Sequence, residues 1–380
     1  MKKQTMMMAV PTLFGLEGLV ADELRYHGLE NVTAENGRVL FEGDWKDLCT
    51  ASLWSRCGER VLIVLSRFRA ESFEELFEGT REAPWENFIG SLDHFPVKGW
   101  SLDSQLHSVP DCQRIIKKAV VERLKECYGN PWFEESGPLM QIQFSIHKNE
   151  VTLMLDTSGP GFHKRGYRQN ANEAPIRETL AAGIADLSRV RSDSIVVDPM
   201  CGSGTILIEA AMKARNLAPG LMRRFQFEQW GCFPLKNMEQ AREEAKSVIR
   251  KDIGFEAIGY DIDPAAVELT LANAKKAHVE KYLRAEQADI ARFRADKIPM
   301  EGHRKALILS NPPYGERLLD TQKAQELYKT MGVVFRPLEN HAYSIISPDE
   351  EFEALFGRKA DKRRKLYNGM LKCQLYMYYR

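Results

Sequence analysis

The chain has 380 residues, of which 44% are hydrophobic and 28% are charged. This balance describes a globular protein with a substantial core and excludes a disordered chain. Its 53 basic and 53 acidic side chains cancel, so a polyanionic partner would have to be bound by local basic patches.

The cysteines and the hydropathy of the chain indicate the cellular compartment to expect. The seven cysteines are scattered without a Cys-x-x-Cys spacing, which argues against a disulfide framework or a zinc site and favours a reducing compartment. The basic and apolar start, Met1 to Leu16, contains Pro11 and lacks a cleavage pattern, so we expect a first strand and no signal peptide. No later segment reaches the ~18 apolar residues of a membrane span. We therefore expect a cytoplasmic protein without bound metal.

Residues 1–157 alternate short strands and helices in the manner of small α+β units. Residues 1–68 predict a ferredoxin-like order, with strands at 6–10, 39–42 and 60–68 and helices at 15–26 and 45–52. Residues 69–157 predict a second α+β unit, with helices at 73–85 and 111–126, a strand at 100–104 and a hairpin at 140–156. Neither unit contains a catalytic constellation.

A basic segment, residues 158–174, separates these units from the remainder. Within it, phosphate-binding cations alternate with aromatic rings, a combination that suits RNA contact or domain docking. A plain basic linker is the alternative. The candidate RNA-binding residues are His163, Lys164, Arg165, Tyr167 and Arg168.

Residues 175–380 alternate strands and helices as in a doubly wound sheet. A helix is expected at 174–186, with Pro175 in its first turn. Ser194 to Thr205 predicts a strand, a glycine turn and a helix start, which brings backbone close to a cofactor. The turn lacks both Gly-x-Gly-x-x-Gly and a following lysine, which weakens dinucleotide and P-loop interpretations. Asp261 ends the next strand, where it could bind ribose hydroxyls.

The sequence Asn-Pro-Pro-Tyr at 311–314 follows an apolar run of strand length. Two prolines end the strand and make a stiff corner with outward carbonyls. The Asn311 amide oxygen and the Pro312 carbonyl could accept both hydrogens of a planar amino group, favouring the positive nitrogen that forms as it attacks an electrophile. Tyr314 could stack on the ring. An ordinary turn is the alternative.

Three motifs, Asp-Pro-Met-Cys-Gly-Ser-Gly-Thr, Gly-Tyr-Asp-Ile-Asp and Asn-Pro-Pro-Tyr, occur in this order. Together they resemble the class I S-adenosylmethionine-dependent amino-methyltransferases. With the N-terminal segments, the chain resembles a THUMP-domain RNA guanine-N2 methyltransferase of the bacterial 23S rRNA large-subunit type. This resemblance implies an α/β, Rossmann-like catalytic domain with a mostly parallel sheet and a C-terminal antiparallel strand. Ferredoxin-like and RNA-binding THUMP domains would precede it.

The resemblance also implies roles for individual residues. Asp289 would accept the adenine amino group of the cofactor, although a helix-capping aspartate is the alternative. Glu178 and Thr179 would make minor cofactor contacts. Cys201 could suggest a nucleophile, but a small residue filling a tight turn explains it equally well. The S-adenosylmethionine site would comprise Asp198, Cys201, Gly202, Gly204, Thr205, Asp261, Ile262 and Asp289, and the catalytic site Asn311, Pro312, Pro313 and Tyr314.

Several points stay open at the level of sequence. The basic run with Arg363, Arg364 and Lys365 is either a solvated face or a phosphate-binding rim beside the site. The insertion at 216–237 could form a base pocket, but packing by its aromatic side chains is the safer interpretation. We expect a monomer whose substrate is 23S rRNA. Alternative activities are tRNA guanine-N2, DNA adenine-N6 or protein glutamine methylation, and a non-catalytic RNA-binding assembly factor is a further alternative.

Overall fold

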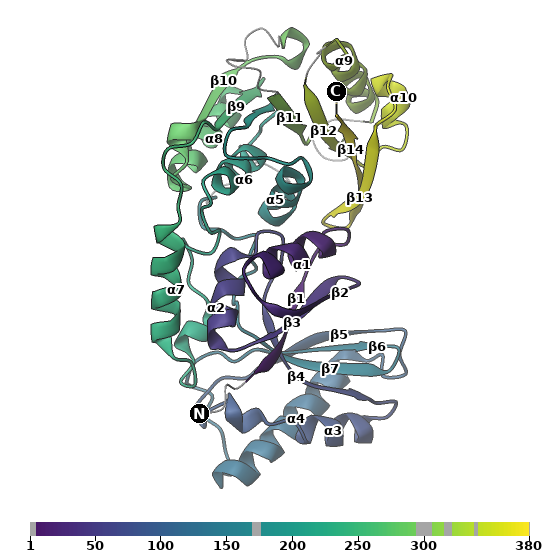
Figure 1. Ribbon diagram of the computed structural model, residues 1–380. Helices are drawn as coiled ribbons and strands as arrows, with labels where there is room; N and C mark the ends of the chain where they lie inside the picture. The colour runs from purple at the N-terminus through teal and green to yellow at the C-terminus, as the bar shows by residue number, and fades with distance from the viewer. Residues whose placement is uncertain (1–4, 169–175, 294–305, 315–320, 338–340, 380) are drawn as a thin grey trace.

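The computed structural model describes residues 5–168, 176–293, 306–314, 321–337 and 341–379. Two seven-stranded sheets organise these residues, one in the N-terminal and one in the C-terminal half (Figure 1). No helix of the described residues is long and apolar enough to cross a membrane.

The N-terminal half is built on one continuous sheet with the order β2-β3-β1-β4-β7-β6-β5. The antiparallel pairing of β4 with β7 joins the two α+β units that the sequence suggests. The strands are β1 (Met6–Pro11), β2 (Glu30–Glu35), β3 (Arg38–Gly43), β4 (Leu62–Arg69), β5 (Val97–Leu102), β6 (Ile142–His147) and β7 (Glu150–Asp156). The helices are α1 (Glu17–Tyr26), α2 (Trp45–Trp54), α3 (Phe73–Arg81) and α4 (Val109–Tyr128).

The C-terminal sheet has the order β10-β9-β8-β11-β12-β14-β13. Its first five strands are parallel, and β14 is antiparallel to β12. The expected doubly wound sheet with a C-terminal antiparallel strand is thus confirmed. The strands are β8 (Ile195–Asp198), β9 (Glu256–Asp261), β10 (Leu283–Gln287), β11 (Ala306–Ser310), β12 (Ala342–Ser347), β13 (Lys362–Asn368) and β14 (Leu371–Tyr378). The helices are α5 (Glu178–Leu187), α6 (Thr205–Ala214), α7 (Leu235–Ser247), α8 (Pro264–Lys276), α9 (Thr321–Phe335) and α10 (Phe352–Phe356).

Three elements differ from expectation. The edge strand β2 is mostly exposed and polar, so it lacks the apolar alternation that identifies a strand. The basic run at the C-terminal end is the strand β13, paired along its whole length with β14. The helix expected at 174–186 begins at Glu178, and its expected start at 174–175 lies outside the described residues.

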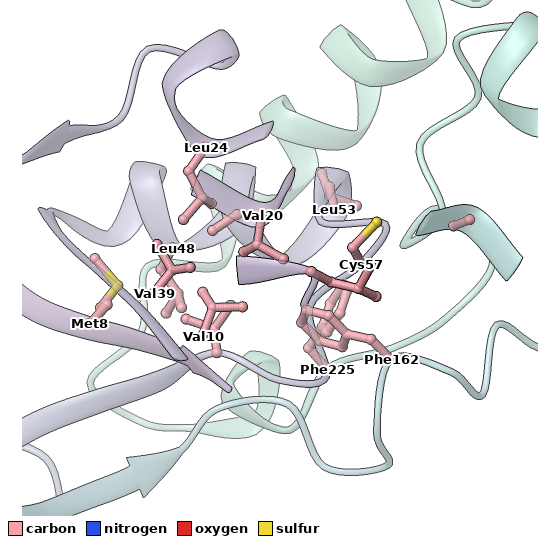
Figure 2. Close-up of a cluster of buried hydrophobic side chains, with 14 of the residues drawn as sticks. Met8, Val10, Val20, Leu24, Val39, Leu48, Leu53, Cys57, Phe162 and Phe225 are labelled. Atoms are coloured by element: carbon pink, nitrogen blue, oxygen red, sulfur yellow. The ribbon is translucent and has the colours of Figure 1, made fainter. Parts of the chain in front are cut away.

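The linker and the insertion at 216–237 pack together against the N-terminal domain. Phe162 of the linker and Phe225 of the insertion lie beside Cys57 and the ferredoxin-like core (Figure 2). Arg223 lies over both rings and donates to the carbonyl oxygen of Gly161 at 2.8 Å. Trp45 of α2 packs edge-on against Phe233. The aromatic side chains of the insertion therefore belong to a core that fixes the two halves together.

Candidate active site

A cavity of about 1080 Å³ lies at the carboxyl ends of the central parallel strands. The strand order reverses between β8 and β11, and open α/β sheets bind ligands at such a switch point. A single ligand pocket usually measures about 300–1,000 Å³, so this cavity has room for a cofactor and a second group. Its lining includes all four predicted catalytic residues and seven of the eight predicted cofactor residues.

The glycine loop after β8 has the shape of a ligand cradle. Gly202 and Gly204 both have positive φ, +53° and +76°, in the left-handed region that favours glycine. A Cβ on Gly204 would lie 2.7 Å from the Thr270 side chain, whereas a Cβ on Gly202 would meet no atom within 4 Å. Gly204 therefore allows close packing on α8 and does not line the cavity, while Gly202 leaves open space for a bound molecule.

Hydrogen bonds from α8 and β9 hold this loop in place. Asp261 accepts from the backbone N–H of Gly202 at 2.8 Å. The Thr270 hydroxyl donates to the carbonyl oxygen of Gly202 at 2.8 Å, and the Asn273 amide donates to that of Ser203 at 3.0 Å. Thr270 and Asn273 were not singled out from the sequence, since a polar residue inside an amphipathic helix carries no distinctive signal. The loop is therefore fixed before any ligand binds.

Cys201 has a structural role. Its thiol lies 3.6 Å from the Thr270 hydroxyl and packs against Gly259, where an added Cβ would be 2.9 Å from the sulfur. Burial, reinforced by nearby Asp198, raises the pKa of this thiol well above its ordinary range. The sulfur therefore fills the turn as a neutral thiol. This agrees with the interpretation of Cys201 as a small residue in a tight turn and not with its interpretation as a nucleophile.

Asp198 is buried at the end of β8, where its carboxyl group accepts from the N–H of Met200 at 3.2 Å. Burial is the main cause that raises its pKa from 3.8 to about 7, and the nearby Asp261 raises it further, while the Met200 hydrogen bond lowers it. The carboxyl group is thus poised to ionise when a cationic group enters the cavity.

We predict that Asp198→Asn stabilises the ligand-free protein more at pH 8 than at pH 5. An acid whose pKa rises on folding binds its proton more tightly in the folded chain, so stability falls as pH rises from 3.8 through about 7. The asparagine removes this cost and keeps an oxygen for the Met200 N–H. Melting temperatures of both proteins across this pH range test the prediction, and parallel curves would contradict it.

The Asn-Pro-Pro-Tyr corner lines the cavity at the end of β11. The Tyr314 hydroxyl donates to the side-chain oxygen of Asn311, which orients the amide with its oxygen toward that donor. An amide oxygen has two lone pairs, so one acceptor position remains for an incoming amino group. Burial raises the pKa of Tyr314 well above its ordinary value, so the hydroxyl remains a donor.

Other predicted cofactor residues also lie on the lining. Ile262 is exposed, and Asp289 accepts from the N–H of Ala291 at 2.9 Å, so it caps the short helix Ile290–Arg292 while facing the cavity. Glu178 and Thr179 are not among the lining residues. Glu178 binds Arg168, and Thr179 donates to Glu59 at 2.6 Å.

Sequence reasoning missed several parts of the lining, including two that lie outside the predicted motifs. One is Arg177, just before α5, and the other is the turn of the β13–β14 hairpin, Asn368–Leu371. Glycine at the first central position of this two-residue turn is a hairpin signal that could have revealed the turn, although not its position at the cavity.

The prediction that Arg165 and Tyr167 contact RNA is wrong, because both side chains are buried, with 2% and 1% of their surface exposed. Arg165 pairs with Glu209 of α6 at 3.3 Å, and the Tyr167 hydroxyl donates to the same carboxylate at 3.0 Å. Both side chains dock the linker onto α6.

The remaining linker cations differ in availability. His163 lies 3.4 Å from Glu59, and Arg168 pairs with Glu178 at 3.0 Å and donates to the Ile176 carbonyl oxygen at 3.2 Å. Both are partly buried, so their contacts within the protein weaken the case for RNA contact. Lys164 is exposed, and its contact with RNA stays a prediction.

The C-terminal cations are likewise unequal. Arg364 donates twice to the carbonyl oxygen of Gly15, at 3.1 and 2.9 Å, and so bridges the two halves of the chain, which weakens the case for RNA contact. Arg363 is exposed and pairs with Glu353. Lys365 is exposed and lies over the Tyr367 ring. Among the described residues, no cluster of His, Cys, Asp or Glu could hold a metal ion.

Comparison with known proteins identifies the catalytic half. Residues 165–377 match the family described as the RMKL-like methyltransferase domain. The chain belongs to the RMKL-like methyltransferase family. Residues 7–62 match the RlmL ferredoxin-like domain and residues 70–156 the THUMP domain, which confirms the three predicted domain types in their predicted order. The exact boundaries stay predictions.

Relatives of this methyltransferase extend over its whole length. Bacillus subtilis YpsC, provisionally named an RNA methyltransferase, is 40% identical over 100% of this chain and 97% of its own. The ribosomal RNA large subunit methyltransferase K/L of Syntrophotalea carbinolica is 33% identical over 95% of this chain. The chain spans about half the length of the K/L enzymes, 52% in this case.

Solved structures agree in fold. SMU.472, provisionally called a methyltransferase and crystallised with SAH, has a TM-score of 0.92 and 42% identity, covering 100% of this chain and 99% of its own. A possible methylase from Clostridium difficile 630 has a TM-score of 0.93 and 41% identity, covering 99% and 98%. A Listeria monocytogenes protein described as a predicted N6-adenine-specific DNA methylase has a TM-score of 0.92 and 40% identity, covering 99% and 96%.

S-adenosylmethionine is the cofactor of this methyltransferase family, and the cavity has the groups to hold it. Gly202 leaves open space at the loop, Asp261 lies at the end of β9, and Asp289 lies at the end of β10. Asp198 offers a buried carboxyl group to a cationic ligand, and a sulfonium is one. The fit rests on the carboxylate acceptors and the open space that the chain itself supplies.

Proposed function

We propose that this methyltransferase modifies the exocyclic amino group N2 of a guanine in structured RNA, with 23S rRNA as the substrate. The main support for the proposal is the Asn-Pro-Pro-Tyr corner. It lines the cavity, and its Asn311 side-chain oxygen is oriented by the Tyr314 hydroxyl. The cofactor binding residues are proposed to be those of the glycine loop together with Asp261 and Asp289.

The chemistry requires a weak nucleophile to be activated. The lone pair of an exocyclic amine is delocalised into the base, and two acceptors on its hydrogens favour the tetrahedral, positive nitrogen of the transition state. In the proposal, Asn311 Oδ1 and the Pro312 carbonyl oxygen accept these hydrogens. Tyr314 borders the cavity beside them and would stack on the base, which leaves its helix at a cost of a few kcal/mol.

The bond changes balance without a further reactant. When bound, S-adenosylmethionine would supply the electrophilic methyl group to the base nitrogen, and its sulfur would leave with the bonding electrons as a neutral thioether. The nitrogen then releases a proton to water. Positioning of this kind can supply ~7–11 kcal/mol of barrier reduction, so no strong general base is required of the chain.

Two features favour RNA over DNA as the substrate. A THUMP domain precedes the catalytic half, and the relatives YpsC and K/L carry names that refer to RNA and to ribosomal RNA. The Listeria structure carries a DNA adenine description at similar identity. Adenine in DNA is therefore the second candidate, and both bases present an exocyclic amine.

The deciding experiment is transfer of labelled methyl from S-adenosylmethionine to unmodified 23S rRNA, tRNA and DNA, followed by nucleoside analysis. We expect N2-methylguanosine in 23S rRNA. Label in tRNA would mean that tRNA is the substrate in place of 23S rRNA, while the proposed chemistry would stay the same. Label only as N6-methyladenine in DNA would overturn the guanine assignment, as would bound cofactor with no transfer to any of the three.

A further inference from the structure

A group of side chains that are exposed, except for the half-buried Tyr367, lies where the N-terminal domain meets the β13–β14 hairpin. It comprises Phe14, Lys365, Tyr367 and Met370, here called the hairpin rim. Phe14 is 54% exposed and packs edge-on against Tyr367, with ring centroids 6.0 Å apart. The Lys365 ammonium lies 5.3 Å from the Tyr367 ring centre. Met370 is 99% exposed.

The rim is a fixed part of the fold. Arg364 binds the carbonyl oxygen of Gly15, and a Cβ on Gly15 would lie only 2.4 Å from the carbonyl oxygen of Lys365. Gly15 has a φ of +93°, in the range that glycine favours. The loop before α1 is therefore held against β13, as the purple loop beside the yellow hairpin shows in Figure 1.

The same hairpin leads directly into the catalytic cavity. Asn368, Gly369, Met370 and Leu371 line it together with Tyr314. Gly369 has a φ of +66° while Met370 has no positive φ, so the turn has positive φ at its first central residue, as a type II′ turn requires. Tyr367 thus directly precedes the cavity-lining turn in the chain, and Met370 belongs both to the rim and to the cavity lining.

The chemistry of the rim suits unpaired nucleotides. Aromatic faces stack on bases irrespective of sequence, and a neighbouring cation neutralises phosphate. No carboxylate of the described residues pairs with Lys365, in contrast to Arg363, which binds Glu353. The charge of the rim is therefore available to a polyanion.

We propose that the hairpin rim binds the single-stranded RNA that flanks the target base, with a flanking base stacked on Tyr367 and Met370 beside the base in the cavity. This inference rests on the proposed function and specifies how that RNA reaches the site. It also gives the hairpin a role in coupling the N-terminal domain to substrate placement.

The test compares Tyr367→Ala, the double variant Phe14→Ala/Tyr367→Ala and Tyr367→Phe with the wild type. Tyr379→Ala is the matched control, because Tyr379 is an exposed tyrosine, 45% exposed, that follows β14 at the end away from the turn. Binding is measured by fluorescence anisotropy with a short single-stranded RNA and with 23S rRNA transcribed in vitro. S-adenosylmethionine affinity and melting temperature are measured alongside.

We expect Tyr367→Ala to bind RNA about tenfold more weakly, equivalent to about 1.4 kcal/mol, and to raise KM for 23S rRNA with little change in kcat. Tyr367→Phe should retain binding, because stacking needs only the ring. Equal binding by wild type and alanine variants, or an equal loss in Tyr379→Ala, would overturn the inference. Failure of the proposed function is distinguishable, because the wild type itself would then methylate no RNA.

Discussion

Replacing Asn311 with alanine is expected to lower the rate of methyl transfer by about 100- to 1,000-fold, the loss typical when one preorganised transition-state contact is removed. The alanine lacks the side-chain oxygen that accepts a hydrogen bond from the Tyr314 hydroxyl. In the proposal, the same oxygen also accepts a hydrogen bond from the target amine. Backbone geometry should be preserved, because the two following prolines fix the corner independently of the side chain. Single-turnover transfer to 23S rRNA measures the effect.

Two controls separate catalysis from binding. S-adenosylmethionine affinity should be unchanged in Asn311→Ala, whereas Asp261→Ala should weaken it, because Asp261 holds the N–H of Gly202. Tyr314→Phe retains the ring and loses the donor that orients the amide, so we expect a smaller loss of rate than in Asn311→Ala. Full activity of Asn311→Ala would contradict the proposed mechanism.

The clustering of the predicted cofactor residues around one cavity was predictable, because the elements that carry them are local in sequence. A glycine turn between a strand and a helix, an aspartate at a strand end and a corner of two prolines each specify backbone geometry within a few residues. Parallel strands then bring these ends to one edge of the sheet, as the cavity lined by Gly202, Asp261 and Asn311 illustrates. Short-range rules of backbone geometry and one rule of sheet topology were therefore sufficient to predict that these residues cluster.

Side-chain burial was less predictable because it depends on partners far away in the chain. Arg165 and Tyr167 have the composition of an RNA-binding segment, yet their shared partner Glu209 lies more than forty residues later, at separations of 44 and 42. A charge in a predicted helix such as α6 gives no sign that it will be buried. The same limit applies to the turn at Asn368–Leu371, whose position at the cavity depends on the pairing of β14 with β12.

The buried Arg165–Glu209 pair leads to the second large prediction, which concerns stability. Arg165→Met should destabilise the protein by about 3–5 kcal/mol, because it removes the hydrogen-bonded counter-charge of a buried carboxylate. Glu209 is fully buried, and besides Arg165 it accepts a hydrogen bond from the Tyr167 hydroxyl and interacts electrostatically with Arg56. Arg165 also donates to the Phe162 carbonyl oxygen at 3.0 Å, and that contact would be lost.

Thermal unfolding and urea denaturation measure the effect, with Arg363→Met as the matched control. Arg363 forms an exposed ion pair with Glu353, with 56% of its side chain accessible, and such pairs contribute about 0–1 kcal/mol. The double variant Arg165→Met/Glu209→Leu should recover much of the loss, because an apolar replacement removes the unpaired charge as well. If Arg165→Met shifted the unfolding midpoint no more than Arg363→Met, the pair would not be what holds the linker on α6.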